Sequence, residues 1–194
     1  MKGKAILLNG ASSAGKSSIS KELQKMMVEP FLIMSVDHFF CASPPYFFKY
    51  DPWMYDTDIP FNDSIKIPTD DKDFDTLMAS FPKIISGFHR SIKAMLDAGN
   101  NLIIDHGFHK LSWYNECREL LKDEDVLYVK ITCDKKTLTK REKKRGDRPT
   151  GMAVYQESVV HREVDYDYII DTTELKPKES AKRIKEYVDK LHAT

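Results

Sequence analysis

Two features are missing from this sequence: long apolar runs and an excess of charge of either sign. No stretch approaches the roughly 20 apolar residues of a membrane-spanning helix, and the N-terminal apolar run is too short for a signal peptide. Lysine and arginine together number 30, as do aspartate and glutamate, so bulk charge gives no argument for nucleic acid or membrane as a partner. We therefore expect a cytoplasmic protein that binds neither.

Cysteine is also scarce, since the sequence contains only Cys41, Cys117 and Cys133. Their odd number and wide spacing give neither a disulfide framework nor the close pairs that ligate zinc. Such cysteine usage is typical of a reducing cytosol. The three thiols are expected to be ordinary buried or half-buried side chains.

What the sequence does contain is a phosphate-binding motif near its N-terminus. Residues 10–17 read G-A-S-S-A-G-K-S, which has the P-loop form G-x-x-x-x-G-K-S. An apolar run typical of a buried strand precedes the motif, and a helical apolar stripe follows it. That stripe consists of Ile19, Leu23, Met26 and Met27. Glycines allow the tight backbone that turns N–H groups towards a phosphate, and a helix N-terminus adds further donors.

The motif predicts a site for ATP and Mg²⁺. Lys16 can reach the β- and γ-phosphates, and the Ser17 hydroxyl can coordinate the metal ion. The residues expected to bind the nucleotide are Gly10, Ala11, Ser12, Ser13, Ala14, Gly15, Lys16, Ser17 and Ser18.

Five short apolar runs alternate with helical patterns along the chain. The runs expected to form strands are 5–9, 31–36, 102–105, 126–131 and 168–171. Strands that alternate with helices build a parallel sheet with helices on both faces. At 194 residues with 41% apolar side chains, we predict one α/β domain, a three-layer fold of the P-loop kinase type with five parallel strands.

Several helix ends can be predicted from single residues. Asp134 can cap a helix that runs towards Arg145, and Gly99 can end a helix that carries the apolar stripe of residues 84–96. Pro177 suits the first turn of a last helix. That helix is expected to turn inward Ala181, Ile184, Val188 and Leu191.

Residues 39–61 differ in composition from the rest of the chain. They hold nine of its 21 aromatic residues, and four prolines interrupt regular structure there. The overlapping stretch 51–75 contains eight aspartates. We interpret 41–77 as a long insertion or lid beside the site, because a loop of that length in a compact domain is usually functional or disordered and so many aromatics argue against disorder.

The insertion is expected to line the pocket for the molecule that accepts the phosphoryl group. The aromatic residues best suited to contact this acceptor are Phe39, Phe40 and Trp53. An aromatic and acidic wall favours an uncharged or cationic acceptor with a flat face. A nucleoside monophosphate would instead require arginines there.

Two aspartates stand where predicted strands end: Asp37 after the second and Asp105 at the end of the third. Because parallel strands bind ligands at their carboxyl ends, both acids should face the P-loop. Asp37 can then accept a proton from an attacking hydroxyl, and Asp105 can help Ser17 hold Mg²⁺. Either could instead bond only to local backbone as a cap or loop aspartate, but the shared edge favours the functional interpretation.

Eight cations crowd into residues 135–148. Most of them are expected to form a solvated helix face. Arg145 and Arg148 differ because they flank the helix end, within a basic lid expected at about 140–151. Guanidinium groups at that position can neutralise charge on a transferring phosphoryl group.

His38 and His106 each follow one of the strand-end aspartates. A histidine in the pocket could bind the acceptor or assist proton transfer. The alternative for both is a hydrogen-bonded or solvent-facing imidazole without a catalytic role.

Several segments, in order from residue 8 to residue 173, together resemble the chloramphenicol phosphotransferase family of P-loop kinases. They are 8–17, 36–37, 103–105, Arg145-Gly-Asp-Arg148, Gly151-Met-Ala153, Gln156, Val160-His161 and 166–173. The resemblance implies ATP- and Mg²⁺-dependent phosphorylation of a hydroxyl, with Asp37 as base and with Arg145 and Arg148 assisting at the phosphates. The chain departs from the family pattern at His106, where the family has a second acid.

The resemblance leaves the acceptor open. It could be an antibiotic such as chloramphenicol, another neutral aromatic or polyol, a nucleoside, or a nucleotide sugar. A different class of function is a nucleotide-binding module without catalysis, which needs the P-loop but no base at Asp37. The set of Asp37, Asp105 and the two lid arginines favours the enzyme. Nothing in the sequence sets the oligomeric state.

Overall fold

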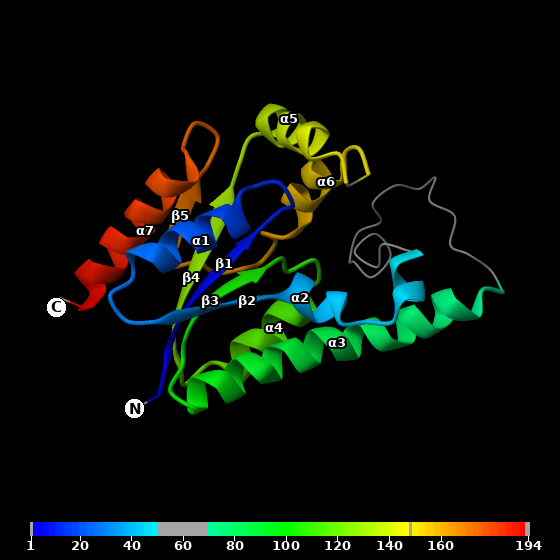
Figure 1. The fold of residues 1–194 in the computed structure, drawn as a ribbon, viewed down its shortest axis with the longest axis horizontal. Helices are drawn as coiled ribbons and strands as arrows, with labels where there is room; N and C mark the ends of the chain where they lie inside the picture. Colours follow the sequence, from blue (N-terminus) through cyan, green and yellow to red (C-terminus); the bar gives the residue numbers. More distant parts are fainter. Residues whose placement is uncertain (1, 50–69, 148, 193–194) are drawn as a thin grey trace.

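The computed structural model describes residues 2–49, 70–147 and 149–192, and a five-stranded sheet forms its middle layer (Figure 1). The strands are β1 (Lys4–Gly10), β2 (Phe31–Ser35), β3 (Asn101–His106), β4 (Asp125–Thr132) and β5 (Tyr168–Asp171). Every pairing is parallel, in the order β2-β3-β1-β4-β5. The predicted α/β fold with five parallel strands is confirmed.

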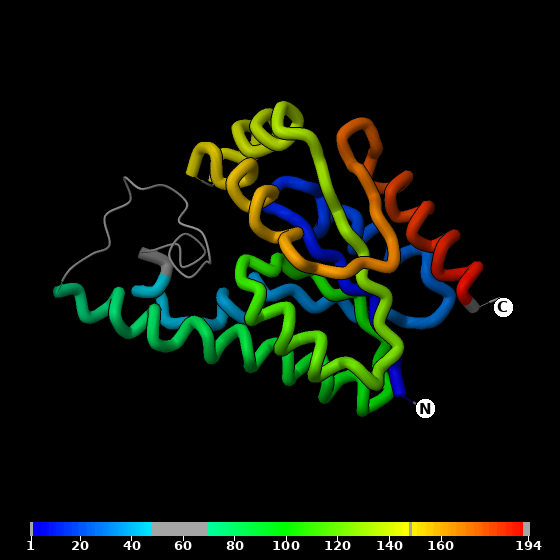
Figure 2. The backbone as a smooth tube through the Cα atoms, turned by 180° about the vertical axis from the view of Figure 1, so that it is seen from behind, coloured from blue at the N-terminus to red at the C-terminus, as the bar shows by residue number. Residues whose placement is uncertain are grey.

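Helices cover both faces of this sheet. On one face lie α1 (Lys16–Met26) and α7 (Pro177–His192), and on the other lie α3 (Lys72–Asp97) and α4 (Leu111–Leu120) (Figure 1, Figure 2). The other helices of the described residues are α2 (Val36–Cys41), the 3₁₀ helix η1 (Pro45–Lys49), α5 (Lys135–Arg145) and α6 (Met152–Val159). Both chain ends lie at the end of the molecule away from α5 and α6.

Alternate residues of the central strand divide the core into two clusters. Ala5 and Leu7 of β1 pack with α3 and α4, whereas Ile6 and Leu8 pack with α1 and α7. All four side chains are buried, because a strand in the middle of a three-layer fold has no face open to water. This burial on both sides explains the uninterrupted apolar run that precedes the P-loop.

The helix ends expected from single residues agree with the structure. The Asp134 side chain caps α5 by accepting hydrogen bonds from the amides of Lys136 and Thr137. Gly99 has a φ of 88° just beyond the end of α3, and Pro177 is the first residue of α7. One inward residue was predicted wrongly: Leu191 is 50% exposed, because it lies in the last turn of α7, beyond the sheet.

The expected insertion is shorter than 41–77. Asp71 caps α3 through its side chain, which accepts hydrogen bonds from two backbone amides, and the helix therefore begins at Lys72. Phe74 and Leu77 are buried because they continue the apolar stripe of α3 towards its N-terminus. Residues 72–77 thus belong to the helix layer, and residues 50–69 lie outside the described part of the chain.

Within the described residues no helix is both long and apolar enough to cross a bilayer.

Candidate active site

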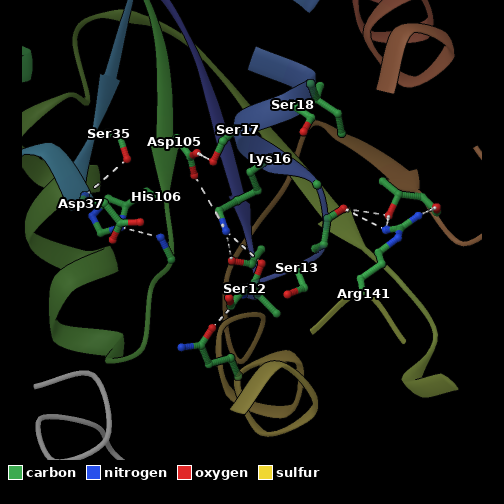
Figure 3. A pocket seen from close by; sticks show the side chains of 18 of the residues that line it. Ser12, Ser13, Lys16, Ser17, Ser18, Ser35, Asp37, Asp105, His106 and Arg141 are labelled. Carbon is green, nitrogen blue, oxygen red and sulfur yellow. Dashed lines mark hydrogen bonds and ion pairs between the residues drawn. The ribbon is translucent and has the colours of Figure 1, made fainter. Parts of the chain in front are cut away.

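A cavity of about 490 Å³ lies at the carboxyl ends of the central strands. Its walls include the whole P-loop, the start of α2, the end of β3 and two arginines of α5 (Figure 3). The strand order β2-β3-β1 brings these segments together, since the ends of three neighbouring parallel strands share one edge. All of the nucleotide-binding residues predicted from the motif, from Gly10 to Ser18, line this cavity.

The P-loop has the backbone that its glycines permit. Gly15 has a φ of 102° and Ser13 a φ of 61°, conformations that favour glycine and that turn successive N–H groups inward. A Cβ at Gly10 would lie 2.3 Å from the carbonyl oxygen of Ile131, so β4 leaves no space for a side chain there. The loop then leads directly into α1 at Lys16.

Lys16 and Ser17 tie this loop to Asp105. Lys16 Nζ donates to the carbonyl oxygens of Gly10 at 2.8 Å and Ala11 at 2.9 Å, and it lies 3.8 Å from Asp105 Oδ1. The Ser17 hydroxyl donates to Asp105 Oδ2 at 2.6 Å. Burial raises the pKa of Asp105, against the lowering effects of Lys16 and of the Ser17 hydrogen bond. Any additional positive charge nearby stabilises the ionised form of such a buried carboxyl group.

Asp37 also lines the cavity, but it does not sit in a loop after the strand. β2 ends at Ser35, and Asp37 lies in the first turn of α2, where its amide donates to Ser35 Oγ at 3.3 Å. Serine at this position can cap a helix, so β2 ends one residue before the end of the predicted strand 31–36 and α2 follows directly. Asp37 and His38 are both exposed, and of these two only Asp37 lines the cavity.

The basic lid contributes one predicted arginine and one that was not predicted. Arg145 lines the cavity and pairs with Asp147 at 2.8 Å, and Arg148 lies outside the described residues. Arg141 lies one helical turn before Arg145 and also lines the cavity. Its guanidinium donates to the Thr172 carbonyl at 2.6 Å and to the Thr172 hydroxyl at 3.0 Å. The i, i+4 spacing from Arg145 was the sequence pattern that could have identified it.

Two further polar residues of the cavity, Gln156 and His109, were not predicted as site residues. The amide of Ser12 donates to Gln156 Oε1 at 2.7 Å, so α6 supports the P-loop directly. His109 is buried on the wall of the cavity. Burial lowers the pKa of His109 to about 4, and the charge of Lys16 acts in the same direction. His109 is therefore a neutral imidazole at physiological pH.

The residues predicted to contact the acceptor do not all line the cavity. His106 lines the cavity, but its ring is buried, and both its nitrogens lie within hydrogen-bond distance of protein partners. Phe39 packs edge-on against Phe88, and Phe40 against Phe81 of α3, so both belong to the core on that face. Neither lines the described cavity. Trp53 lies outside the described residues.

The hydrogen-bond donors and oxygen ligands of the cavity suit a nucleoside triphosphate with Mg²⁺. The Ser13 hydroxyl is buried in the loop with no hydrogen-bond partner among the described residues, and the loop amides and Lys16 surround the same space. Ser17 and Asp105 provide the hard oxygen ligands that Mg²⁺ prefers. In the described part of the chain no cluster of three or more His, Cys, Asp and Glu side chains could hold a metal. Mg²⁺ usually binds one or two carboxylates plus phosphates, and Asp105 provides one such carboxylate.

Comparison with known proteins gives a consistent result. A family model described as "Chloramphenicol phosphotransferase-like protein" matches residues 3–189. A protein of Mycobacterium tuberculosis (strain H37Rv) described as a "Putative O-phosphotransferase" is 29% identical over 190 residues, which cover 95% of this chain and 81% of that protein.

Two solved structures have the same fold. A sugar kinase from Janibacter sp. has a TM-score of 0.66 at 18% identity, with coverage of 96% of this chain and 95% of that one. The APS kinase of Mycobacterium tuberculosis in complex with AMPPNP and APS has a TM-score of 0.64 at 14% identity, with coverage of 97% and 98%. The predicted P-loop kinase architecture is thereby confirmed.

Proposed function

The chain belongs to the chloramphenicol phosphotransferase-like family, and on that premise we propose that it is an ATP-dependent kinase for a hydroxyl of a small molecule. Family membership and the kinase fold support a kinase-type phosphotransferase. The observation that carries the finer proposal is the meeting of Lys16, Asp105 and Asp37 at one cavity. The acceptor we favour is an antibiotic or a related neutral molecule, as in the family description.

We assign the nucleotide to the P-loop. MgATP would supply the phosphoryl group and a cation that neutralises its charge. The loop amides from Gly10 to Gly15 would hold the phosphates, and Lys16 would exchange its two carbonyl partners for phosphate oxygens. Ser17 and Asp105 are the residues that would hold Mg²⁺. The APS kinase of the same fold was solved with AMPPNP, an ATP analogue, which supports ATP as the donor.

We assign the acceptor hydroxyl to Asp37. This exposed carboxylate lines the cavity from the first turn of α2, which follows β2, the strand next to β3 and Asp105 in the sheet. It can accept the hydroxyl proton as the oxygen attacks phosphorus, and it can return that proton to water because it is exposed. A neutral imidazole at His109 adds no charge to this region.

Arg145 and Arg148 are assigned to the phosphates. Arg145 lines the cavity, and its present partner Asp147 is an exposed carboxylate that it could exchange for a phosphate oxygen at little cost. Arg141 has a different role in this proposal. Its hydrogen bonds to Thr172 and to the carbonyl oxygen of Ala14 keep the end of β5 beside the P-loop.

Charge on the cavity wall supports a neutral or cationic acceptor. The cations among its described residues are Lys16, Arg141 and Arg145, which the P-loop and lid contribute. The end of β2, on the acceptor side, is followed by the carboxylate of Asp37 instead. A phosphorylated acceptor would be repelled by that carboxylate, so among the alternatives a nucleoside is more suitable than a nucleotide sugar.

A non-catalytic nucleotide-binding module is the second candidate. Such a protein would bind MgATP through the same P-loop but would not need Asp37. One experiment separates the two: ATP consumption is screened over antibiotics, nucleosides and nucleotide sugars, and the products are identified by mass spectrometry. A phosphorylated acceptor that Asp37→Asn fails to produce supports the kinase. Tight MgATP binding without any acceptor-dependent product supports the module.

A further inference from the structure

A chain of polar side chains runs through the apolar layer behind the cavity. Glu116 of α4 accepts a hydrogen bond from the Ser86 hydroxyl at 2.6 Å, and its Oε2 lies 2.8 Å from His89 Nδ1 on α3. His89 Nε2 lies 2.8 Å from His106 Nε2, at the end of β3. Both rings are fully buried, and Phe88 and Phe108 pack against His106.

The direction of these hydrogen bonds follows from one backbone amide. The Gly107 N–H can only donate, and it points at His106 Nδ1 at 2.7 Å. A neutral His106 must then carry its proton on Nε2 and donate it to His89 Nε2. His89 in turn carries its proton on Nδ1 and donates to Glu116. Every bond therefore points towards the carboxylate, an arrangement in which successive bonds strengthen one another.

His106, at the cavity end of this chain of hydrogen bonds, fixes a loop of the cavity. Gly107 lines the cavity, and it is packed so closely that a Cβ there would lie 2.9 Å from His109 Cε1. The following amide, that of Phe108, donates to Asn9 Oδ1 of β1 at 2.8 Å. Residues 107–109 are thus held from the α3 side by His106 and from the P-loop side by Asn9.

This loop lies where phosphoryl transfer would take place. β3 is the strand between β1, which leads into the P-loop, and β2, which leads to Asp37. His106, Asp105 and Asp37 accordingly all line one cavity (Figure 3). A shift of the loop by 1 Å would alter the alignment of donor and acceptor, and such misplacement can cost about 100-fold in rate.

We propose that Glu116, acting through His89, holds His106 in a single tautomer and thereby fixes residues 107–109 at the reacting end of the cavity. Glu116 and His89 are positioning residues, since neither lines the cavity. The effect on catalysis rests on the proposed kinase function, whereas the tautomers themselves do not. Histidines that merely fill the core would contribute to stability but would not affect the turnover of the folded protein.

The test compares three variants on one helix. Glu116→Ala removes the acceptor at the end of the chain. Glu116→Gln keeps an oxygen for His89 Nδ1 and an amide for Ser86. Glu119→Ala is the matched control, because Glu119 is an exposed carboxylate of α4 that forms an ion pair with the exposed Lys122. Thermal unfolding shows that each variant is folded, and ¹⁵N NMR of histidine-labelled protein reports the tautomers without any substrate.

In the wild type we expect the Nδ1–H tautomer for His89 and the Nε2–H tautomer for His106. Glu116→Ala should mix these tautomers, shift the Gly107 amide resonance and lower kcat about tenfold or more, with KM for ATP within about twofold. Glu116→Gln should restore the tautomers and most of kcat, and Glu119→Ala should change neither. The proposal is overturned by the opposite tautomers in the wild type, or by Glu116→Ala matching Glu119→Ala in kcat. If no acceptor is ever phosphorylated, the NMR measurement still decides the tautomers, and only the kinase assignment fails.

Discussion

The hydroxyl of Ser17 donates a 2.6 Å hydrogen bond to Asp105 Oδ2, which joins the first turn of α1 to the end of β3. Burial raises the pKa of this carboxyl, because its ionised form is poorly solvated. A bound cation would stabilise that ionised form. Ser17 and Asp105 would be the residues that hold Mg²⁺ when MgATP binds, and the metal ion would supply positive charge at this carboxylate. Asp105 should therefore contribute to catalysis through the metal rather than through the acceptor.

Asp105→Asn tests this assignment. The amide keeps the shape but loses the charge, so kcat at low Mg²⁺ should fall by about tenfold or more, and raising Mg²⁺ should restore part of it. The measurement is kcat as a function of Mg²⁺ concentration. Asp171→Asn is the control, because Asp171 is an exposed carboxylate at the end of β5 that does not line the cavity, and its side chain accepts from the Thr173 amide. A loss of the same size at every Mg²⁺ concentration would contradict a metal-binding role.

Lys16→Ala should weaken MgATP binding or abolish turnover. The ammonium is the charge closest to the loop carbonyls of Gly10 and Ala11, and its removal leaves the core of the protein untouched. Calorimetric titration with MgATP measures the affinity, and circular dichroism checks the fold. Lys21→Ala, an exposed lysine on the same helix, should leave affinity and turnover unchanged. Unchanged affinity and turnover in Lys16→Ala would show that the P-loop has another role.

The features predicted well from the sequence are local ones. The P-loop was recognisable because strand, glycine-rich turn and helix follow one another within 23 residues, from Lys4 to Met26, and each leaves its own periodicity. The cap of α5 at Asp134 was predictable for the same reason. Strand ends could be aligned on one edge because parallel topology requires it.

The features that were missed depend on contacts between distant segments. Apart from its i, i+4 spacing from Arg145, nothing local distinguishes Arg141 from the neighbouring lysines, and the residue that accepts its hydrogen bonds, Thr172, is 31 residues away. His89 was not considered, and His106 was assigned to the acceptor, because their mutual hydrogen bond joins α3 to β3. Phe39 and Phe40 were assigned to the pocket from composition alone, whereas α3 covers both. Whether a side chain is buried by a distant segment cannot be derived from the sequence around that side chain alone.

The free energy of unfolding should fall as the pH is lowered from about 6.5 towards 4. An unfolded histidine takes up a proton near pH 6.5, but the pKa of folded His109 is only about 4. Protons then bind the unfolded state preferentially, so stability is complete above pH 6.5 and is lost below it. For His109 alone the loss by pH 4 is about 3 kcal/mol.

His109→Gln should reduce this pH dependence. Urea unfolding between pH 7 and pH 4.5 gives the slope, and the upper part of this range avoids most carboxylate titration. The slope should decrease without vanishing, because burial also lowers the pKa of His89. Asp105 acts in the opposite sense, since its pKa is raised in the folded protein. An identical slope in wild type and His109→Gln would show that His109 has the same pKa in the folded and unfolded states, so that its burial does not disfavour the protonated form.

Asp37→Asn is the decisive test of the mechanism. Asparagine keeps the shape and one acceptor oxygen, but it cannot take a proton from the attacking hydroxyl. General-base catalysis is typically worth about 10²- to 10⁴-fold, so kcat should fall by that order while ATP affinity changes little.

The matched control for this substitution is Asp73→Asn. Asp73, like Asp37, is an exposed aspartate in the first turn of a helix, so its replacement removes the same favourable interaction with the helix dipole. Any loss that both variants share reflects helix stability, and only the excess in Asp37→Asn measures the base. The quantity to compare is kcat at saturating ATP and acceptor. If Asp37→Asn stays within about threefold of the wild type, far less than a lost base would cost, then Asp37 is not the base and the non-catalytic module becomes the better account of this cavity.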